Sequence, residues 1–320
     1  NITVGDYAFF NNAALVNVDL SSLVSIGEQA FSGGRTQAFW LKENAWNYAF
    51  DYEYVNGELR VKDYMYNSFA PAFTHADLSN ATYIGKGAFA YNEALSSVQF
   101  ATKGLTEISD FAFAGTKLVS LELPVAVTKL GDYAFFGSNV EQMNLTSVET
   151  IGKYAFAETP LKRIQLHSGG IIGDYAFAYC DQLKTVENIN NVYSLGVGAF
   201  YAAGLETVDL KNVYYIGDYA FGESAVKEII FGDCLKNLGE NPFYGCQMET
   251  FGKKETVIFN GEEAGTRLIE TYDVSESVKI INGVLYQIVA NGGMELVSYP
   301  MCKANETYTV EEGTVRISAK

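Results

Sequence analysis

The chain has 320 residues and a formal net charge of −16, because 22 lysines and arginines face 38 aspartates and glutamates. This excess of negative charge argues against a nucleic-acid backbone or an anionic membrane surface as a partner. A hydrophobic fraction of 48 % argues against a disordered chain, and no uninterrupted apolar stretch approaches the roughly 20 residues that a membrane-spanning helix needs.

A six-residue phrase, Ile-Gly-x-x-Ala-Phe, recurs along the chain, for example at residues 26–31 and 216–221. Successive copies lie 21 to 24 residues apart, except for one interval of 58 residues, and leucine-rich repeats have periods of roughly 20–29 residues. Because periodic apolar positions indicate burial, we expect the phenylalanines to stack as a spine inside a solenoid. These residues are Phe9, Phe31, Phe89, Phe113, Phe135, Phe156, Phe177, Phe200, Phe221 and Phe243.

A second element, Leu-x-x-Val-x-Leu, precedes most copies, for example at Leu161, Ile164 and Leu166. Its last two apolar residues share one face of a strand, so one strand per repeat predicts a parallel sheet with strands about 4.8 Å apart. We expect the glycine of the phrase where the backbone needs a positive φ or approaches a neighbouring coil closely. The aspartate that follows it in several copies, such as Asp110 and Asp174, is expected to cap a short helical turn.

The 58-residue interval contains an irregular segment at about residues 32–72 that is rich in aromatic residues. Within it, Asn56-Gly57 is a two-residue turn signal and predicts a hairpin with residues 59–61 as the return strand. Two interpretations remain open: degenerate repeats whose aromatics pack on the solenoid, or an exposed patch for glycan or protein contact, since Trp and Tyr are favoured anchors. The candidate contact residues of this segment are Trp40, Trp46, Tyr52 and Tyr54.

The repeat array is expected to extend over residues 1–246 and to continue through 247–320 in a modified form. Residues 284–289 and 295–299 alternate and flank a four-residue loop that contains glycine, which predicts a hairpin-type repeat. The last residues begin a further copy and stop before its Ala-Phe. We therefore expect the chain to be a fragment of a longer protein, truncated at its C-terminus.

The outward-facing position after the central apolar residue of the predicted strands carries an acid or an amide in eight copies. One interpretation is a solvated face on which amides dilute the repulsion between like charges on neighbouring strands. The other is a binding groove that selects cationic or hydroxyl-rich partners. The candidate binding residues on this face are Asp19, Asp77, Gln99, Glu122, Asn144, Gln165, Glu187 and Asp209.

Catalytic and metal-binding constellations are weak or missing in the sequence. Glu187 and Asp209 match the ~5–10 Å spacing of a glycosidase pair, but so would many surface pairs of an acidic solenoid. No calcium loop of the Asp-x-Asp-x-Asp-Gly type occurs, and the two histidines have no triad companions. Cys180 and Cys246 lie three coils apart, too far for a disulfide, and are expected to be buried free thiols. We therefore expect no catalytic residue, no metal and no cofactor.

The repeat, Leu-x-x-Val-x-Leu followed by Ile-Gly-x-x-Ala-Phe-x-x-Cys, resembles the BspA-like (Treponema pallidum-type) leucine-rich repeat family. Cys180 and Cys246 stand three residues after Phe177 and Phe243, where this family often has cysteine, and residues 281–310 look like its hairpin variant. The resemblance covers about 1–31 and 73–320. It implies a secreted or surface-displayed protein with a role in adhesion to host proteins or other cells, and it supplies no catalytic residue.

Together these features predict an α/β repeat solenoid: a right-handed leucine-rich repeat with one parallel sheet on the concave side, short helical turns on the convex side and a C-terminal β-hairpin variation. The expected function is that of a non-catalytic extracellular or cell-surface scaffold for binding and adhesion, which recognises host proteins, other cells or glycans. It would bind no nucleic acid and would not insert into a membrane. The alternative is a carbohydrate-active enzyme or lyase on a parallel β-helix that uses acidic groove residues. A β-helix has two or three strands per coil, so the strand count is the predicted discriminator.

Overall fold

The computed structural model describes residues 2–10, 12, 15, 23–31, 52–55, 58–61, 74–100, 104–248, 250–259, 262–269, 271–281, 283–290, 292–298 and 309–317. The chain divides into two compact units, Asn1–Met143 and Asn144–Lys320. The boundary expected at residue 246 lies inside the second unit, and the continuation of the array through 247–320 stays a prediction.

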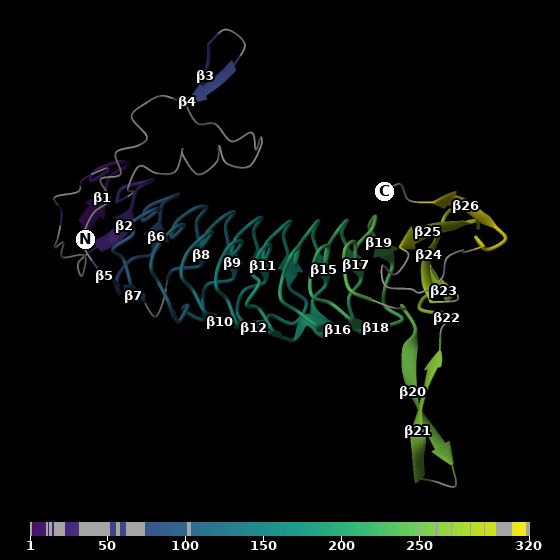
Figure 1. Cartoon of the computed structure of the whole chain (residues 1–320). Helices are drawn as coiled ribbons and strands as arrows, with labels where there is room; N and C mark the ends of the chain where they lie inside the picture. Colours follow the sequence, from purple (N-terminus) through teal and green to yellow (C-terminus); the bar gives the residue numbers. More distant parts are fainter. Residues whose placement is uncertain are drawn as a thin grey trace. The chain divides into compact units, whose positions relative to one another are not determined.

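The Leu-x-x-Val-x-Leu segments form short strands that pair in parallel from coil to coil (Figure 1). In the first unit β5 pairs with β7, and in the second β12 pairs with β14 and β16 with β18. Burial alternates along these strands: in β12, Ile164 and Leu166 are buried while Arg163 is exposed. The predicted stack of parallel strands is confirmed. The strands of this long ladder are β5 (His75–Leu78), β7 (Ser97–Phe100), β10 (Gln142–Leu145), β12 (Arg163–Leu166), β14 (Thr185–Glu187), β16 (Thr207–Leu210) and β18 (Glu228–Phe231).

A second parallel ladder of shorter strands precedes the glycines, so the prediction of a single sheet is wrong. Most of these strands have only two residues, which is too short for an alternation pattern to be recognised. They form because the glycine N–H donates across coils, as from Gly173 to the Ile151 carbonyl (2.8 Å). The strands of this short ladder are β1 (Ile2–Val4), β2 (Leu23–Ile26), β6 (Tyr83–Ile84), β8 (Glu107–Ile108), β9 (Lys129–Leu130), β11 (Thr150–Ile151), β13 (Ile171–Ile172), β15 (Ser194–Leu195), β17 (Tyr215–Ile216) and β19 (Asn237–Leu238).

The return segment after each glycine consists of turns, and the predicted short helical turns are not confirmed. Tyr175 has a φ of 54°, in the left-handed region, which interrupts a right-handed helical run. The N–H groups of Tyr175 and Phe177 instead donate to the Val197 and Ala199 carbonyls of the next coil, at 2.7 and 2.8 Å. Within the described residues the only helix is a 3₁₀ helix, η2 (Ile189–Asn191).

The glycine of the phrase marks a close approach between coils, one of the two reasons that the sequence suggests for it. A Cβ at Gly217 would lie 2.5 Å from the carbonyl carbon of Gly196 and 2.6 Å from the backbone nitrogen of Val197, closer than real Cβ atoms come. The positive φ occurs two residues later, at Tyr219 (53°). Glycine is therefore required here by the lack of space for a side chain.

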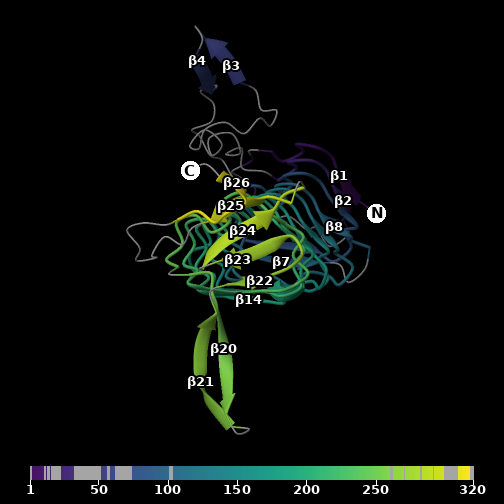
Figure 2. The same cartoon turned by 90° about the vertical axis from the view of Figure 1, so that its right-hand side faces the viewer.

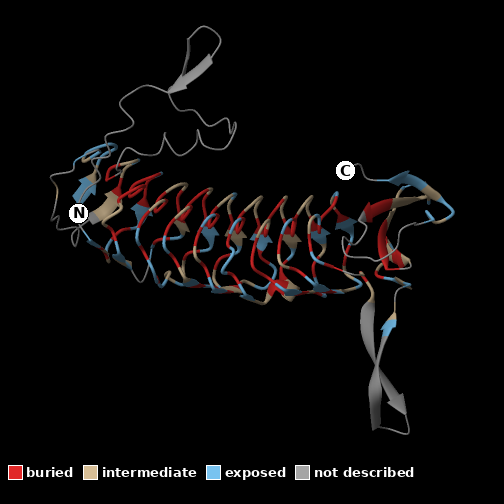
Figure 3. Ribbon diagram, in the orientation of Figure 1, coloured by how far each residue is buried: buried red, intermediate tan, exposed pale blue. Residues whose placement is uncertain are grey.

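The phenylalanines stack face to face from coil to coil, and buried residues recur along the coils of the ribbon in Figure 3. In the first unit Phe9, Phe31, Phe89, Phe113 and Phe135 have ring centroids 5.1–5.5 Å apart. In the second unit the corresponding distances are 5.2–5.6 Å, between Phe156, Phe177, Phe200, Phe221 and Phe243. The predicted spine is thus observed as a stack of five rings in each unit.

The C-terminal part of the second unit is built from antiparallel strands. β20 (Lys253–Phe259) and β21 (Glu262–Ile269) form a long hairpin that extends away from the coils of this unit in both views (Figure 1, Figure 2). The hairpin predicted at 284–289 and 295–299 is β24 (Val284–Ile288) paired antiparallel with β25 (Met294–Ser298). The same sheet contains β22 (Tyr272–Asp273), β23 (Val278–Ile281) and β26 (Thr314–Ile317).

The segment 32–72 is described only in its hairpin. β3 (Tyr52–Val55) pairs antiparallel with β4 (Glu58–Val61), as the Asn-Gly turn predicts. Trp40 and Trp46 lie outside the described residues, and only the backbone of Tyr52 and Tyr54 is described. The choice between degenerate repeats and a binding insertion therefore stays open.

Candidate functional site

The candidate binding residues occupy outward positions on or beside the strands of the long ladder, and we call them the acid–amide column. Strand alternation places them there, since the apolar residue before each is buried or half-buried, as Ile164 is before Gln165. In the first unit Asp77 is registered with Gln99, and in the second Gln165 with Glu187. The described members are Asp77, Gln99, Glu122, Asn144, Gln165, Glu187 and Asp209; Asp19 lies outside the described residues.

Three members of the column hold the turn that ends their own strand. The Oδ1 atoms of Asp77, Asn144 and Asp209 each accept a hydrogen bond from the backbone N–H two residues later, at 3.0, 3.0 and 3.1 Å. Short polar side chains commonly bond locally in this way and stop a strand. Sequence reasoning missed this role, although the repeated pattern of Asp or Asn, then leucine, then a polar residue carries the signal.

The two carboxylates suggested as a glycosidase pair already have partners. Glu187 forms an ion pair with Arg163 of the neighbouring strand β12. Asp209 accepts the Lys211 N–H, and its Oδ2 lies 3.5 Å from the Lys211 ammonium. An acid–base pair needs carboxyl groups that face one substrate bond, and this geometry favours no such use.

The remaining members of the column are available to a ligand. The side chains of Gln99, Glu122 and Gln165 make no hydrogen bond or ion pair with other described residues. Gln99 and Glu122 are exposed and Gln165 is half-buried. Each presents donors or acceptors, and the strand ladder holds Gln99 and Gln165 in register, which is the arrangement that a pre-organised contact needs.

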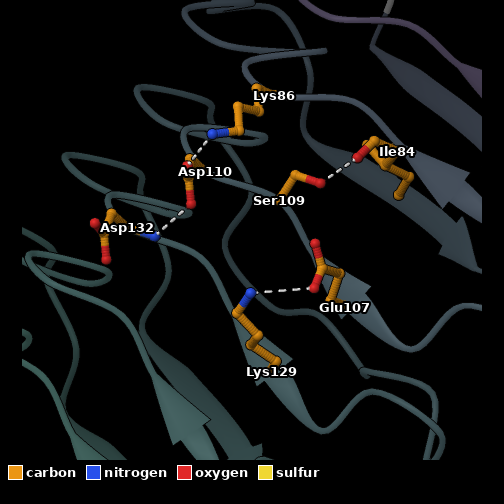
Figure 4. Close-up of polar contacts among 7 residues, drawn as sticks. All are labelled: Ile84, Lys86, Glu107, Ser109, Asp110, Lys129 and Asp132. Atoms are coloured by element: carbon orange, nitrogen blue, oxygen red, sulfur yellow. Dashed lines mark hydrogen bonds and ion pairs between the residues drawn. The ribbon is translucent and has the colours of Figure 1, made fainter. Parts of the chain in front are cut away.

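The aspartates that follow the glycine position of the repeated phrase contact neighbouring coils, and sequence reasoning assigned these contacts incorrectly. Asp110 was expected to cap its own turn, but its Oδ1 accepts the backbone N–H of Asp132 in the next coil at 2.9 Å (Figure 4). Its Oδ2 lies 2.8 Å from the Lys86 ammonium of the preceding coil, and this hydrogen bond and charge raise the pKa of Lys86. One carboxylate therefore links three coils.

The same link recurs along the stack. In the second unit Asp174 Oδ1 accepts the Val197 N–H at 3.0 Å, and its Oδ2 lies 2.9 Å from the Lys153 ammonium. Figure 4 also shows a Lys129–Glu107 pair across the short ladder (3.3 Å) and the Ser109 hydroxyl donating to the Ile84 carbonyl (2.6 Å). The acids on this side hold coils together.

Cys180 and Cys246 are buried free thiols, as the sequence predicts. Their Sγ atoms lie 3.2 and 3.0 Å from the Phe156 and Phe221 carbonyl oxygens of the preceding coil. Burial raises the pKa of Cys180 to about 12 and that of Cys246 to about 11. Because the thiolate is the reactive form, both groups are chemically inert at neutral pH.

Two further properties concern the described residues alone. In that part of the chain no three histidine, cysteine or acidic side chains come together in a way that could hold a metal ion. None of its helices has the length and apolar character to cross a membrane.

Stacked coils with parallel strand ladders, an inner phenylalanine spine and outward polar positions define a leucine-rich repeat solenoid. The count of two strands per coil, for example β16 and β17, does not separate this class from a β-helix, so the predicted discriminator fails. The sequence comparison does separate them. The chain belongs to the BspA type leucine rich repeat family, whose model matches six copies over residues 1–56, 60–171 and 168–264.

Three solved structures are similar to this chain. A leucine-rich repeat protein from Bacteroides ovatus is 22 % identical, with a TM-score of 0.43 over 76 % of this chain and 68 % of its own. A leucine rich cell surface protein from Faecalibacterium prausnitzii is 17 % identical, with a TM-score of 0.41 over 99 % of this chain and 59 % of its own. The pneumococcal vaccine antigen PcpA is 20 % identical, with a TM-score of 0.37 over 71 % of this chain and 58 % of its own.

The chain thus spans less than two thirds of the length of the last two structures. No curated protein matches it.

Proposed function

We propose that the chain is a non-catalytic binding and adhesion scaffold, displayed outside the cell or on its surface, which recognises host proteins, other cells or glycans. The observation that carries the proposal is the acid–amide column. Its members Gln99, Glu122 and Gln165 have no described partner and lie on or beside the strands of the long ladder, whereas neighbouring acids are used in turns and ion pairs. Family membership supports a scaffold without catalytic residues.

The chemistry of the column favours cationic or hydroxyl-rich partners. A carboxylate such as Glu122 accepts hydrogen bonds from ammonium, guanidinium or hydroxyl groups, and amides such as Gln99 both donate and accept. A partner that binds through Glu122 should bind more weakly at high salt, because exposed charges are screened beyond about 8 Å at physiological ionic strength. The aromatic residues Trp40, Trp46, Tyr52 and Tyr54 are proposed as a second contact region.

The test is a screen of immobilised extracellular-matrix proteins and a glycan array, followed by titration of the best partner. The double variant Gln99→Ala/Glu122→Ala should weaken binding by about tenfold or more, since truncating an interface contact of this kind costs on the order of 1–2 kcal/mol. The matched control is Glu107→Ala, a half-buried acid of the same unit that lies on the short ladder and pairs with Lys129. Absence of any partner, or equal effects of both variants, would refute the proposal.

The aromatic region is tested separately. Trp40→Ala and Trp46→Ala should each weaken the binding of the same partner if residues 32–72 are a binding insertion. Unchanged binding, together with a lower urea midpoint, would show that these rings belong to the core of degenerate repeats.

A further inference from the structure

Three tyrosines from two neighbouring coils form an aromatic cluster on the outside of the second unit. Tyr193 and Tyr214 stack with ring centroids 5.3 Å apart, and Tyr193 lies 5.4 Å from Tyr215 in a tilted arrangement. Tyr193 is 43 % exposed, Tyr215 is 37 % exposed, and Ile171 of the preceding coil is 46 % exposed. Together they make an apolar surface of the kind that marks an interaction site.

The short ladder brings these residues together. Ile171 is registered with Ser194, and Ser194 with Tyr215. The N–H of Tyr214 donates to the Tyr193 carbonyl at 3.1 Å, and the N–H of Tyr193 donates to the Gly170 carbonyl at 2.9 Å. Strand register and these backbone hydrogen bonds therefore place the residues that carry the rings side by side in neighbouring coils.

The surroundings of the patch are unusually poor in charge for this acidic chain. The coil segments 167–173, 188–194, 212–217 and 234–239 contain no aspartate, glutamate or arginine, and their one lysine is Lys236. The Lys236 ammonium lies over the Tyr214 ring, 5.2 Å from its centroid.

Amides take the place of charges around the rings. Asn212 and Asn237 are exposed, and Asn190 and Asn191 are half-buried. Asn212 Nδ2 donates to Asn191 Oδ1 at 2.9 Å, which orients the first amide beside the tyrosines. We call Ile171, Tyr193, Tyr214 and Tyr215, with these four asparagines, the tyrosine–amide patch.

We infer that the tyrosine–amide patch is a binding site for an uncharged glycan. Sugar rings have apolar C–H faces that pack on aromatic rings, and their hydroxyls both donate to and accept from amides and phenols. An ionic ligand would lose its hydration here without gaining a charged partner, apart from Lys236. The inference deepens the proposed binding function by naming a ligand class, and it places that ligand on the short ladder, away from the acid–amide column.

The test is affinity electrophoresis of the whole chain in gels that contain mannan, starch, galactan or a mixed-linkage β-glucan. Polygalacturonate and heparin serve as anionic comparisons. The chain should be retarded by at least one neutral polysaccharide and by neither anionic one. Tyr193→Ala and Tyr215→Ala should each weaken retardation by about tenfold. The matched control is Tyr179→Ala, which removes another exposed tyrosine of the same unit and should change nothing.

Two measurements distinguish a loss of glycan binding from a folding defect. Asn212→Ala removes an exposed amide and its hydrogen bond to Asn191 but no buried side chain, and it should weaken retardation severalfold. In the wild-type chain, the retarding polysaccharide, added as short oligosaccharides, should slow hydrogen exchange in 188–194 and 212–217. Faster or unchanged exchange there would refute the inference.

The outcomes also separate this inference from the proposed function. Gln99→Ala/Glu122→Ala should keep its retardation, since those residues lie on the other ladder. A chain that binds a matrix protein through the acid–amide column but no neutral polysaccharide would refute only the glycan site. A chain that binds neither would refute both. Binding of a protein that Tyr215→Ala abolishes, with no polysaccharide bound, would show that the patch is a protein contact and would overturn the inference.

Discussion

Removal of one ring from the phenylalanine spine should destabilise the second unit by about 3–5 kcal/mol, the usual cost of truncating a buried phenylalanine to alanine. Phe177 is fully buried, and its ring lies 5.4 Å from Phe156 and 5.2 Å from Phe200, with interplanar angles of 1° and 9°. Each such stack contributes about 0.5–1.5 kcal/mol beyond the burial of area. The rest of the cost comes from the cavity that Phe177→Ala leaves.

Double-mutant cycles separate the stacking from the cavity. Phe177 and Phe200 touch, so their coupling energy should be about 0.5–1.5 kcal/mol, whereas Phe177 and Phe221 are separated by Phe200 and should be additive within about 0.5 kcal/mol. Phe177→Leu keeps most of the volume and should cost only about 1–1.5 kcal/mol.

The assay combines urea unfolding followed by far-UV circular dichroism with hydrogen exchange of the Phe177 amide, which donates to the Ala199 carbonyl. Both are needed because long repeat arrays can unfold locally, in which case a single global free energy of unfolding is not defined. A loss below about 1 kcal/mol would refute the spine as the source of stability. Equal coupling of Phe177 to Phe200 and to Phe221 would refute the stacking contribution.

Three further predictions use other contacts between or within coils. Gly217→Ala should cost at least about 1–3 kcal/mol in urea unfolding because its Cβ would meet the backbone of the neighbouring coil. Gly5→Ala, in the same slot but with nothing within 4 Å, should change stability by less than about 0.5 kcal/mol, and equal effects would contradict the close approach. Asp209→Ala removes one turn hydrogen bond on an exposed strand face, so a melt should show a loss below about 1 kcal/mol. Burial raises the pKa of Cys180 to about 12, so the folded chain keeps a proton that the unfolded chain releases above about pH 8.5. The stability that Cys180 contributes should be fully present below that pH and fall by about 1.4 kcal/mol per pH unit above it. Because Cys246 adds a slope of its own, the test compares the wild-type chain with Cys180→Ala, and equal slopes between about pH 8.5 and 10.5 would contradict this.

The solenoid could be predicted because its core repeats strictly along the chain. Residues such as Ile164 and Leu166 alternate over enough positions to identify a strand, and the phenylalanines recur every 21 to 24 residues outside the one interval of 58. The short ladder could not be predicted, because strands of two residues carry no period. The residue with a positive φ, which precedes the alanine of the repeated phrase, does leave a signal in the sequence. Gly87 and Gly198 occupy the slot that tyrosine fills in other copies, which indicates that this position needs a positive φ.

The candidate site was only partly predictable, because an outward position does not reveal whether a side chain already has an intramolecular partner. The sequence pattern does not distinguish Asp77 and Asp209 from residues that contact a ligand, yet their carboxylates accept hydrogen bonds within turns. Gln99 and Glu122 have longer side chains than these aspartates, and different residues follow them along the chain. Whether a polar side chain is available to a ligand depends on the local backbone conformation, and the residue type at each outward position does not reveal that conformation.

The net charge of −16 therefore does not describe the binding chemistry of this chain. Part of that charge is structural, since carboxylates such as Asp110 and Asp174 accept backbone N–H groups of the next coil while binding a lysine of the preceding one. A ligand that approached these acids would have to compete with bonds that hold the stack together. Selection for binding can act more freely where no inter-coil contact needs an acid. The segments around Tyr193 and Tyr215 meet that condition, because backbone bonds and an asparagine pair join their coils, and their other side chains are free to be aromatic and uncharged.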